Sequence, residues 1–111
     1  MKRELAPVVM FVYNRLDSVE QTIENLKKNE LADQTDLFVF SDAAKKEKQA
    51  ESVKLVREYI HKIVGFKSVH IIEAEKNKGL AKSVITGVTE IINKRGKVIV
   101  VEDDFELLPV K

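Results

Sequence analysis

Short apolar runs alternate with stretches of helical periodicity along the chain. The run 7–13 is almost continuously apolar and rich in β-branched residues, which predicts a strand buried on both faces. The runs 37–40, 69–72 and 98–101 are predicted to be the second, third and fourth strands. Between successive runs the apolar positions recur every three or four residues, as they do on one face of a helix. The predicted order is therefore β-α-β-α-β-α-β.

Capping signals predict where the helices begin and end. Asp17 with Glu20 three residues later has the form of a capping box, so we expect the first helix to begin there. The second helix is expected to close at Gly65. Gly96 stands where a glycine after the last turn would end the third helix.

This order of elements predicts the fold class α/β, as one domain over residues 1–111. The expected architecture is a three-layer α/β/α Rossmann-like parallel sheet with strand order 3-2-1-4 and right-handed crossovers. In such a sheet the ligand crevice opens where the strand order reverses, outside the carboxyl ends of strands one and four. Polar residues follow the strand ends around this point: Asn14 and Arg15 after the first strand, Ser41 and Asp42 after the second, and Glu102, Asp103 and Asp104 after the fourth.

The three consecutive carboxylates repel one another unless a positive charge lies nearby. Carboxylate oxygens suit Mg²⁺ or Mn²⁺, and Mg²⁺ often shares its coordination shell with the phosphate oxygens of a substrate. A cation site that also takes a diphosphate is therefore one interpretation of Glu102, Asp103 and Asp104. The other is that they are solvated residues at a strand exit.

Composition narrows the class of protein. The chain has 111 residues, of which 44% are hydrophobic and 33% charged, which is typical of a soluble globular domain. The formal charge of +1 gives no general attraction to nucleic acid or to an anionic membrane, so we expect no nucleic-acid partner. With no cysteine there is no thiolate metal site and no cysteine nucleophile. A cytoplasmic location, possibly at the cytosolic face of a membrane, is expected.

Several common chemistries find no motif in the chain. Neither G-x-G-x-x-G nor the P-loop pattern G-x-x-x-x-G-K-[ST] occurs. No serine stands in a nucleophile elbow. His61 falls within a predicted helix and His70 within a predicted strand, and both are expected to be structural or surface residues.

Four short segments, taken in order, resemble a known family. They are Tyr13-Asn14-Arg15, Ser41-Asp42, the stretch Asn-Lys-Gly-Leu-Ala-Lys at 77–82, and Glu102-Asp103-Asp104. Together they look like the nucleotide-binding half of a GT-A-type glycosyltransferase of the family 2-like group. The acidic triplet is similar to the Glu-Asp-Asp version of the DxD motif in N-acetylglucosaminyltransferase I. The resemblance covers essentially the whole chain. It implies a partial GT-A fold that binds the donor in the transfer of a sugar from a nucleotide-diphosphate sugar to an acceptor.

The resemblance also implies roles for the residues of the nucleotide pocket. Asp42 would accept a hydrogen bond from the base, where the alternative is that it caps the next helix. Asn14 and Arg15 would line the pocket, although Arg15 could instead pair with Asp17. Lys82 would reach the donor, or else be a solvated lysine. A UDP-sugar is favoured over a GDP-sugar as the donor.

For the acidic triplet the resemblance implies a metal site. Asp104 would coordinate Mn²⁺ or Mg²⁺ at the diphosphate, with Asp103 as a further ligand. Glu102 and Asp103 would also hold ribose or sugar hydroxyls and the waters of the metal. The metal would act as a Lewis acid that neutralises charge on the departing nucleoside diphosphate.

Two further expectations concern the chain as a whole. The acceptor half of the family, which supplies the general base, does not fall within these residues, so the 111-residue chain alone is expected to be inactive. The fourth strand is expected to leave an exposed apolar edge, and self-association through that edge or through Leu107 and Leu108 is predicted.

Two alternatives to a glycosyltransferase stay open. One is a non-catalytic α/β binding or assembly module whose carboxylates only bind a cation or are structural. The other is a phosphotransfer domain.

Overall fold

Four parallel strands form one sheet in the order β3-β2-β1-β4 within residues 6–102, the part of the chain that the computed structural model describes. The strands are β1 (Val8–Val12), β2 (Asp36–Ser41), β3 (Ser68–Glu73) and β4 (Ile99–Glu102). The register places Met10 of β1 opposite Val39 of β2 and opposite Val101 of β4. The predicted strand order and parallel pairing are confirmed.

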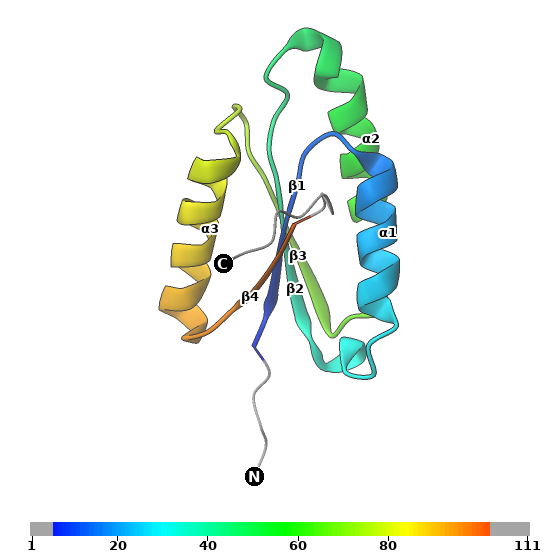
Figure 1. Ribbon diagram of the computed structural model, residues 1–111, viewed down its shortest axis with the longest axis vertical. Coiled ribbons are helices and arrows are strands. Elements are labelled where there is room, and N and C mark those ends of the chain that lie inside the picture. Colours follow the sequence, from blue (N-terminus) through cyan, green and yellow to red (C-terminus); the bar gives the residue numbers. More distant parts are fainter. Residues whose placement is uncertain (1–5, 103–111) are drawn as a thin grey trace, which may run out of the picture.

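Three helices cover the two faces of this sheet. They are α1 (Leu16–Lys27), α2 (Ala50–Ile60) and α3 (Leu80–Arg95), and short 3₁₀ turns occupy 32–34 and 47–49. α1 and α2 lie side by side on one face, and α3 lies on the other (Figure 1). The described residues therefore form the expected α/β/α layers. No helix among them is both long and apolar enough to cross a membrane.

The central strand explains why the first apolar run is continuous. All five residues of β1 are buried. Val8, Met10 and Val12 pack into the cluster formed with α1 and α2, while Val9 and Phe11 pack with Ile91 of α3. Because a strand alternates its side chains between the two faces, a strand covered on both faces must be apolar at every position.

The capping box at the first helix is wrong. The first helical hydrogen bond runs from the Val19 N–H to the Arg15 carbonyl (3.0 Å), so α1 begins at Leu16 and Asp17 already lies inside its first turn. There Asp17 accepts a local bond from the Ser18 N–H (2.9 Å) and caps no other N–H of the helix among the described residues. A carboxylate in the first turn still complements the helix dipole, which is why the sequence signal is similar.

The second helix ends earlier than predicted, and the third ends as predicted. α2 stops at Ile60, because the following N–H groups of Lys62 and Ile63 bond three residues back and tighten the last turn. Gly65 lies beyond this turn. Gly96, with φ 81°, ends α3 in the left-handed conformation that favours glycine.

β4 lies at the edge of the sheet and exposes apolar side chains. In the strand order it pairs with β1 on one side and is last in the row on the other, among the described strands. Ile99 is 51% exposed and Val100 44%. The expectation of an exposed apolar edge is met at these two residues.

Candidate functional site

A pocket of about 380 Å³ opens where β1 and β2 end and α3 begins. Its wall includes the polar side chains that the sequence placed at the crevice after strands one and two. Asn14, Arg15 and Asp42 all line it, although Arg15 and Asp42 are 27 positions apart in the sequence. The other lining residues come from the same strand ends, from the segment before α2 and from the start of α3: Phe11, Val12, Tyr13, Phe40, Lys45, Gln49, Asn77, Gly79 and Ser83.

The carboxylate of Asp42 organises the entry to α3. One oxygen accepts the backbone N–H groups of Ala43 and Lys78, both at 2.9 Å. The other accepts the Gly79 N–H at 2.9 Å and the Asn77 side-chain amide at 3.2 Å. A carboxylate offers about four acceptor positions, so these four donors use its capacity in this structure. Asp42 thus binds the loop that leads into α3, through the N–H groups of Lys78 and Gly79, and is not seen to cap the next helix in the chain.

A second polar contact closes the wall formed by the segment before α2. The Tyr13 hydroxyl donates to Gln49 Oε1 (2.6 Å) and accepts the backbone N–H of Lys45 (2.9 Å). Because Tyr13 directly follows β1, this hydroxyl holds the 43–49 segment against the end of the central strand. Lys45 and Gln49, the two residues of this segment that the hydroxyl contacts, both line the pocket.

Two stacked aromatic rings form the apolar part of the pocket. Phe11 and Phe40 lie with ring centroids 5.4 Å apart and an interplanar angle of 25°. Gly87 of α3 allows this arrangement, because a Cβ at that position would lie 3.1 Å from Phe11 and 3.2 Å from Phe40. The missing side chain lets the helix pass directly over both rings.

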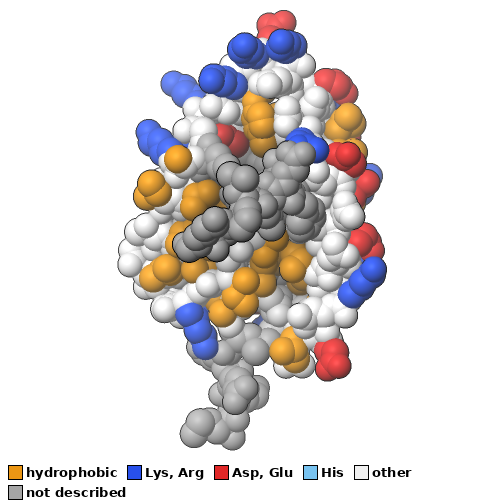
Figure 2. Space-filling view, in the orientation of Figure 1, with side chains coloured by type: hydrophobic (Ala, Val, Ile, Leu, Met, Phe, Trp, Pro, Cys, Tyr) orange, Lys and Arg blue, Asp and Glu red, His pale blue; other side chains and the backbone are white. Residues whose placement is uncertain are grey.

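The charge of the lining is positive although the chain as a whole is nearly neutral. Arg15 and Lys45 line the pocket, and the single carboxylate among the described lining residues, Asp42, is already engaged by four donors. Lys and Arg side chains also gather at the end of the molecule where α2 and α3 begin, the upper end in Figure 2. Such a pocket attracts an anionic ligand locally.

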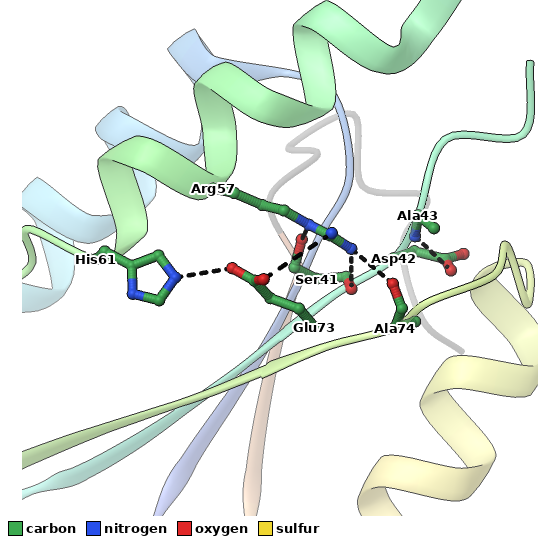
Figure 3. A network of polar contacts seen from close by, with 7 residues as sticks. All are labelled: Ser41, Asp42, Ala43, Arg57, His61, Glu73 and Ala74. Atoms are coloured by element: carbon green, nitrogen blue, oxygen red, sulfur yellow. Dashed lines mark hydrogen bonds and ion pairs between the residues drawn. The ribbon is translucent and has the colours of Figure 1, made fainter. Parts of the chain in front are cut away.

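The side chain of Arg57 contacts Ser41, the residue before Asp42 of the pocket wall, but is not itself part of the lining. Arg57 of α2 reaches the ends of β2 and β3, where its guanidinium contacts Ser41, Glu73 and Ala74 (Figure 3). Its side chain is 24% exposed and absent from the lining of the pocket. No motif in the sequence pointed to Arg57. The signal available was its place on the apolar face of α2, next to the buried Val56.

A second pocket of about 420 Å³ lies beside the first, between α3 and the ends of β2 and β3. Both pockets are lined by Phe40, Asp42 and Ser83. The second is lined by charges of both signs, among them Glu73, Glu75, Lys76, Lys78 and Glu90. Its lining holds the four carboxylates of Asp42, Glu73, Glu75 and Glu90 against the two ammonium groups of Lys76 and Lys78. This excess of negative charge disfavours an anionic ligand, so the first pocket is the stronger candidate for one.

The remaining predicted site residues lie elsewhere or outside the described residues. Lys82 is in the first turn of α3, as expected, but it is exposed and lines neither pocket. The backbone of Glu102 pairs with Phe11, so β4 ends beside the first pocket. Asp103 and Asp104 lie outside the described residues. Within residues 6–102, no group of three His, Asp or Glu side chains is placed to hold a metal ion.

The amino-terminal ends of β2 and β3, at the other end of the strands from the pocket, carry a polar cluster with a structural role. Asp36 accepts hydrogen bonds from the Ser68 hydroxyl (2.6 Å) and from Arg95 (2.6 Å). These bonds, first that of Ser68 and then that of Arg95, lower the pKa of Asp36 below its ordinary value. His70 contacts the same hydroxyl (2.9 Å) and stacks on Phe38 at 4.5 Å, so it is a structural residue, as expected.

Comparison with known proteins agrees with this architecture. In the structure of the mannosyltransferase PcManGT from Pyrobaculum calidifontis in complex with GDP-Man and Mn²⁺, a similar arrangement covers 77% of this chain, with a TM-score of 0.51 and 16% sequence identity. The match spans 24% of that protein's length, so it shows a shared GT-A Rossmann-like fold over about a quarter of the longer chain. No curated protein compared with the chain matches it in sequence. The profile of the family described as "Glycosyl transferase family 2" matches residues 8–110, and the chain therefore belongs to glycosyl transferase family 2.

Proposed function

We propose that the first pocket binds a nucleoside diphosphate sugar and that the chain is the donor-binding part of a family 2 glycosyltransferase. The observation that carries the proposal is the pocket itself, at the carboxyl ends of parallel strands where such sheets bind ligands. Its aromatic rings suit a base, and its positive wall suits a diphosphate. The structural neighbour was solved with GDP-Man, which is a ligand of this class.

Recognition of the base is proposed to use Asp42 and the segment that it holds. The Asn77 amide makes the longest of the four contacts to the carboxylate, at 3.2 Å, and also donates to the Ala43 carbonyl at 2.8 Å. An N–H of the base would replace Asn77 at the Asp42 oxygen, and Asn77 would keep its second acceptor. The two shorter backbone contacts of Lys78 and Gly79 would remain in place.

The diphosphate is proposed to lie toward the cationic side of the pocket, near Arg15 and Lys45. Lys82, in the first turn of α3, would approach it from outside the lining. The beginning of α3 adds the partial positive charge of a helix N-terminus. Asn14, at the end of β1, supplies a side-chain amide that can donate and accept beside the ribose.

A divalent cation, Mn²⁺ or Mg²⁺, is proposed to be held by Asp104 and Asp103. The donor set fits, because consecutive carboxylates supply the hard oxygen ligands that these ions take. The run begins at Glu102, whose backbone pairs with Phe11 of the pocket lining. When bound, the cation supplies Lewis-acid neutralisation of the leaving diphosphate. Glu102 and Asp103 are proposed to hold hydroxyl groups of the ribose or the sugar.

The identity of the base is part of the proposal that needs measurement. The preference for UDP over GDP expected from the sequence stays a prediction, and the structural neighbour was solved with a guanine nucleotide. Titration of UDP and then of GDP into the chain by calorimetry, with Mn²⁺ and again with EDTA, tests both points. We expect one of the two nucleotides to bind, and to bind only when Mn²⁺ is present.

Two variants separate donor binding from a plain binding module. Asp104→Asn removes a proposed cation ligand and is expected to lower the Mn²⁺-dependent affinity at least about tenfold, because even the loss of an outer-shell partner of a metal site costs about 10–100-fold. Asp33→Asn, at an exposed position in the 32–34 turn, is the control and is expected to bind like the unaltered chain. Absence of nucleotide binding by the unaltered chain, or an unchanged affinity in Asp104→Asn, would contradict the proposal.

The edge of β4 is proposed to associate with a second copy of the chain. Ile99 and Val100 are exposed on this strand, and a free strand edge offers unpaired backbone donors and acceptors to another chain. This contact is separate from the donor pocket, so each can be tested without the other.

A further inference from the structure

The guanidinium of Arg57 joins the ends of two neighbouring strands behind the pocket (Figure 3). Its Nε donates to Ser41 Oγ at 2.8 Å. Its Nη2 donates to the carbonyl oxygens of Ser41 (3.1 Å) and Ala74 (2.9 Å). Ser41 is the last residue of β2, and Ala74 directly follows β3. One planar cation therefore fixes the two points at which the chain leaves the sheet.

Both points lead to the contact between Asp42 and the loop before α3. Asp42 follows Ser41, and the chain that leaves β3 at Ala74 returns to the Asp42 carboxylate through the N–H groups of Lys78 and Gly79. The Ala74 N–H also donates to the Ser41 carbonyl (2.9 Å). Arg57 thus holds the base of a closed ring of contacts, and the Asp42 carboxylate closes its other end.

The surroundings of Arg57 match a fixed rather than a mobile side chain. Ser41, its main partner, is 1% exposed. Glu73 Oε1 lies 3.9 Å from Nη1 and partly balances the charge, and the other Glu73 oxygen contacts His61 Nε2 at 2.7 Å. Because Arg57 does not line the pocket, any influence on a ligand must pass through the residues that it holds.

We propose that Arg57 is a positioning residue for donor binding. It keeps the ends of β2 and β3 in register, so that Asp42 and the 77–79 segment retain the geometry in which the pocket accepts the nucleotide. The proposal rests on the proposed function. It predicts that lysine replaces arginine only in part, because one ammonium group lacks the planar set of donors that reaches both carbonyls and the hydroxyl.

The test compares Arg57→Met and Arg57→Lys with Arg95→Met as the matched control. Arg95 also joins two elements of the fold, α3 and β2, through its bond to Asp36 (2.6 Å), but it does so at the amino-terminal end of the strand, away from the pocket. The first measurement needs no ligand and is the amide hydrogen exchange of Lys78 and Gly79, whose N–H groups bind Asp42. The second is the calorimetric Kd of each variant for UDP and GDP with Mn²⁺.

We expect Arg57→Met to speed the exchange of both amides by about tenfold or more and to raise Kd by a similar factor, with Arg57→Lys between it and the unaltered chain. Arg95→Met is expected to lower the melting temperature and leave both measurements unchanged. If Arg57→Met does not fold, Arg57→Lys against Arg95→Met decides the question.

Unchanged exchange and unchanged Kd in Arg57→Lys, or equal changes in Arg95→Met, would overturn the positioning role. The outcome for the proposed function is separate. If the unaltered chain binds neither nucleotide, donor binding fails, while the exchange of Lys78 and Gly79 still reports whether Arg57 positions the ring.

Discussion

The carboxylate of Asp42 accepts the backbone N–H of Gly79 at 2.9 Å, across 37 positions of the sequence. This bond joins the residue that follows β2 to the residue that precedes α3. The end of β2 and the loop before α3, which both contribute to the wall of the pocket, are thereby held together. Asp42 consequently has a structural role in the free protein besides its proposed contact with the base.

Asp42→Asn is expected to destabilise the chain by about 1–3 kcal/mol. The substitution turns one carboxylate oxygen into an amide group, so that two of the four donors then face a donor instead of an acceptor. Urea unfolding followed by circular dichroism measures the change. Asp33→Asn, which removes an exposed carboxylate in the 32–34 turn, serves as the control. Equal stability of the two variants would show that Asp42 does not hold the loop.

Asp36 is expected to make the stability of the chain depend on acid pH. Hydrogen bonds from Ser68 and then Arg95 lower its pKa from the ordinary value of 3.8. Its contribution is therefore complete above 3.8 and is lost as the pH falls through the lower pKa of the folded state, because the unfolded chain takes up the proton first. Unfolding free energies at about pH 6 and about pH 2.5 should differ less in Asp36→Asn than in the unaltered chain. An identical pH dependence in both would contradict this.

Two glycines at opposite ends of α3 allow backbone strain to be separated from binding. Gly79 has φ 83° and ψ 154°, and Gly96 has φ 81° and ψ −17°. Alanine would have room at both but would meet strain, about 1 kcal/mol at Gly96 and about 2–3 kcal/mol at Gly79, whose conformation is almost exclusive to glycine. We expect Gly79→Ala to weaken nucleotide binding and Gly96→Ala to leave it unchanged. Calorimetry and thermal unfolding of both variants measure this, and equal losses of affinity would refute it.

Self-association is expected to depend on the edge of β4. Val100→Lys places a charge on the exposed edge and should lower the apparent mass at high protein concentration, because charged edge residues oppose strand pairing. Leu55→Lys is the control, since Leu55 of α2 is 42% exposed and Val100 is 44% exposed. Light scattering over a concentration series measures the mass. A monomer at every concentration in the unaltered chain, or no difference between the variants, would exclude this contact.

The layers of the fold could be predicted because the pattern of burial is written in the sequence. Each strand is a short apolar run, and β1 is apolar at every position because α1 and α2 cover one face and α3 the other. Strand order followed from the commonest arrangement of doubly wound sheets, in which the fourth strand returns to the other side of the first. Helix starts were less predictable. Asp17 lies one residue inside α1, where a capping residue and a first-turn carboxylate look alike in sequence.

The pocket could be predicted as a place but not in its contacts. The carboxyl ends of parallel strands meet at one edge, which brings Asn14, Arg15 and Asp42 together. The partners of Asp42 were not predicted, because three of its four donors are backbone N–H groups, which leave no trace in residue type. Arg57 was missed for a related reason. Two of its three hydrogen-bond acceptors are carbonyl oxygens, so the sequence shows only an arginine on an apolar helix face.

The central claim is that the pocket at the ends of β1 and β2 binds a nucleoside diphosphate. A titration of UDP or GDP with Mg²⁺, followed through the backbone amide signals of the labelled chain, tests it most directly. We expect the signals of Asp42, Lys78 and Gly79 to shift in a saturable way as nucleotide is added. The signals of Asp36 and Ser68, at the amino-terminal ends of β2 and β3, are expected to stay in place. Signals that do not move with either nucleotide, or that move only near Asp36, would contradict the claim.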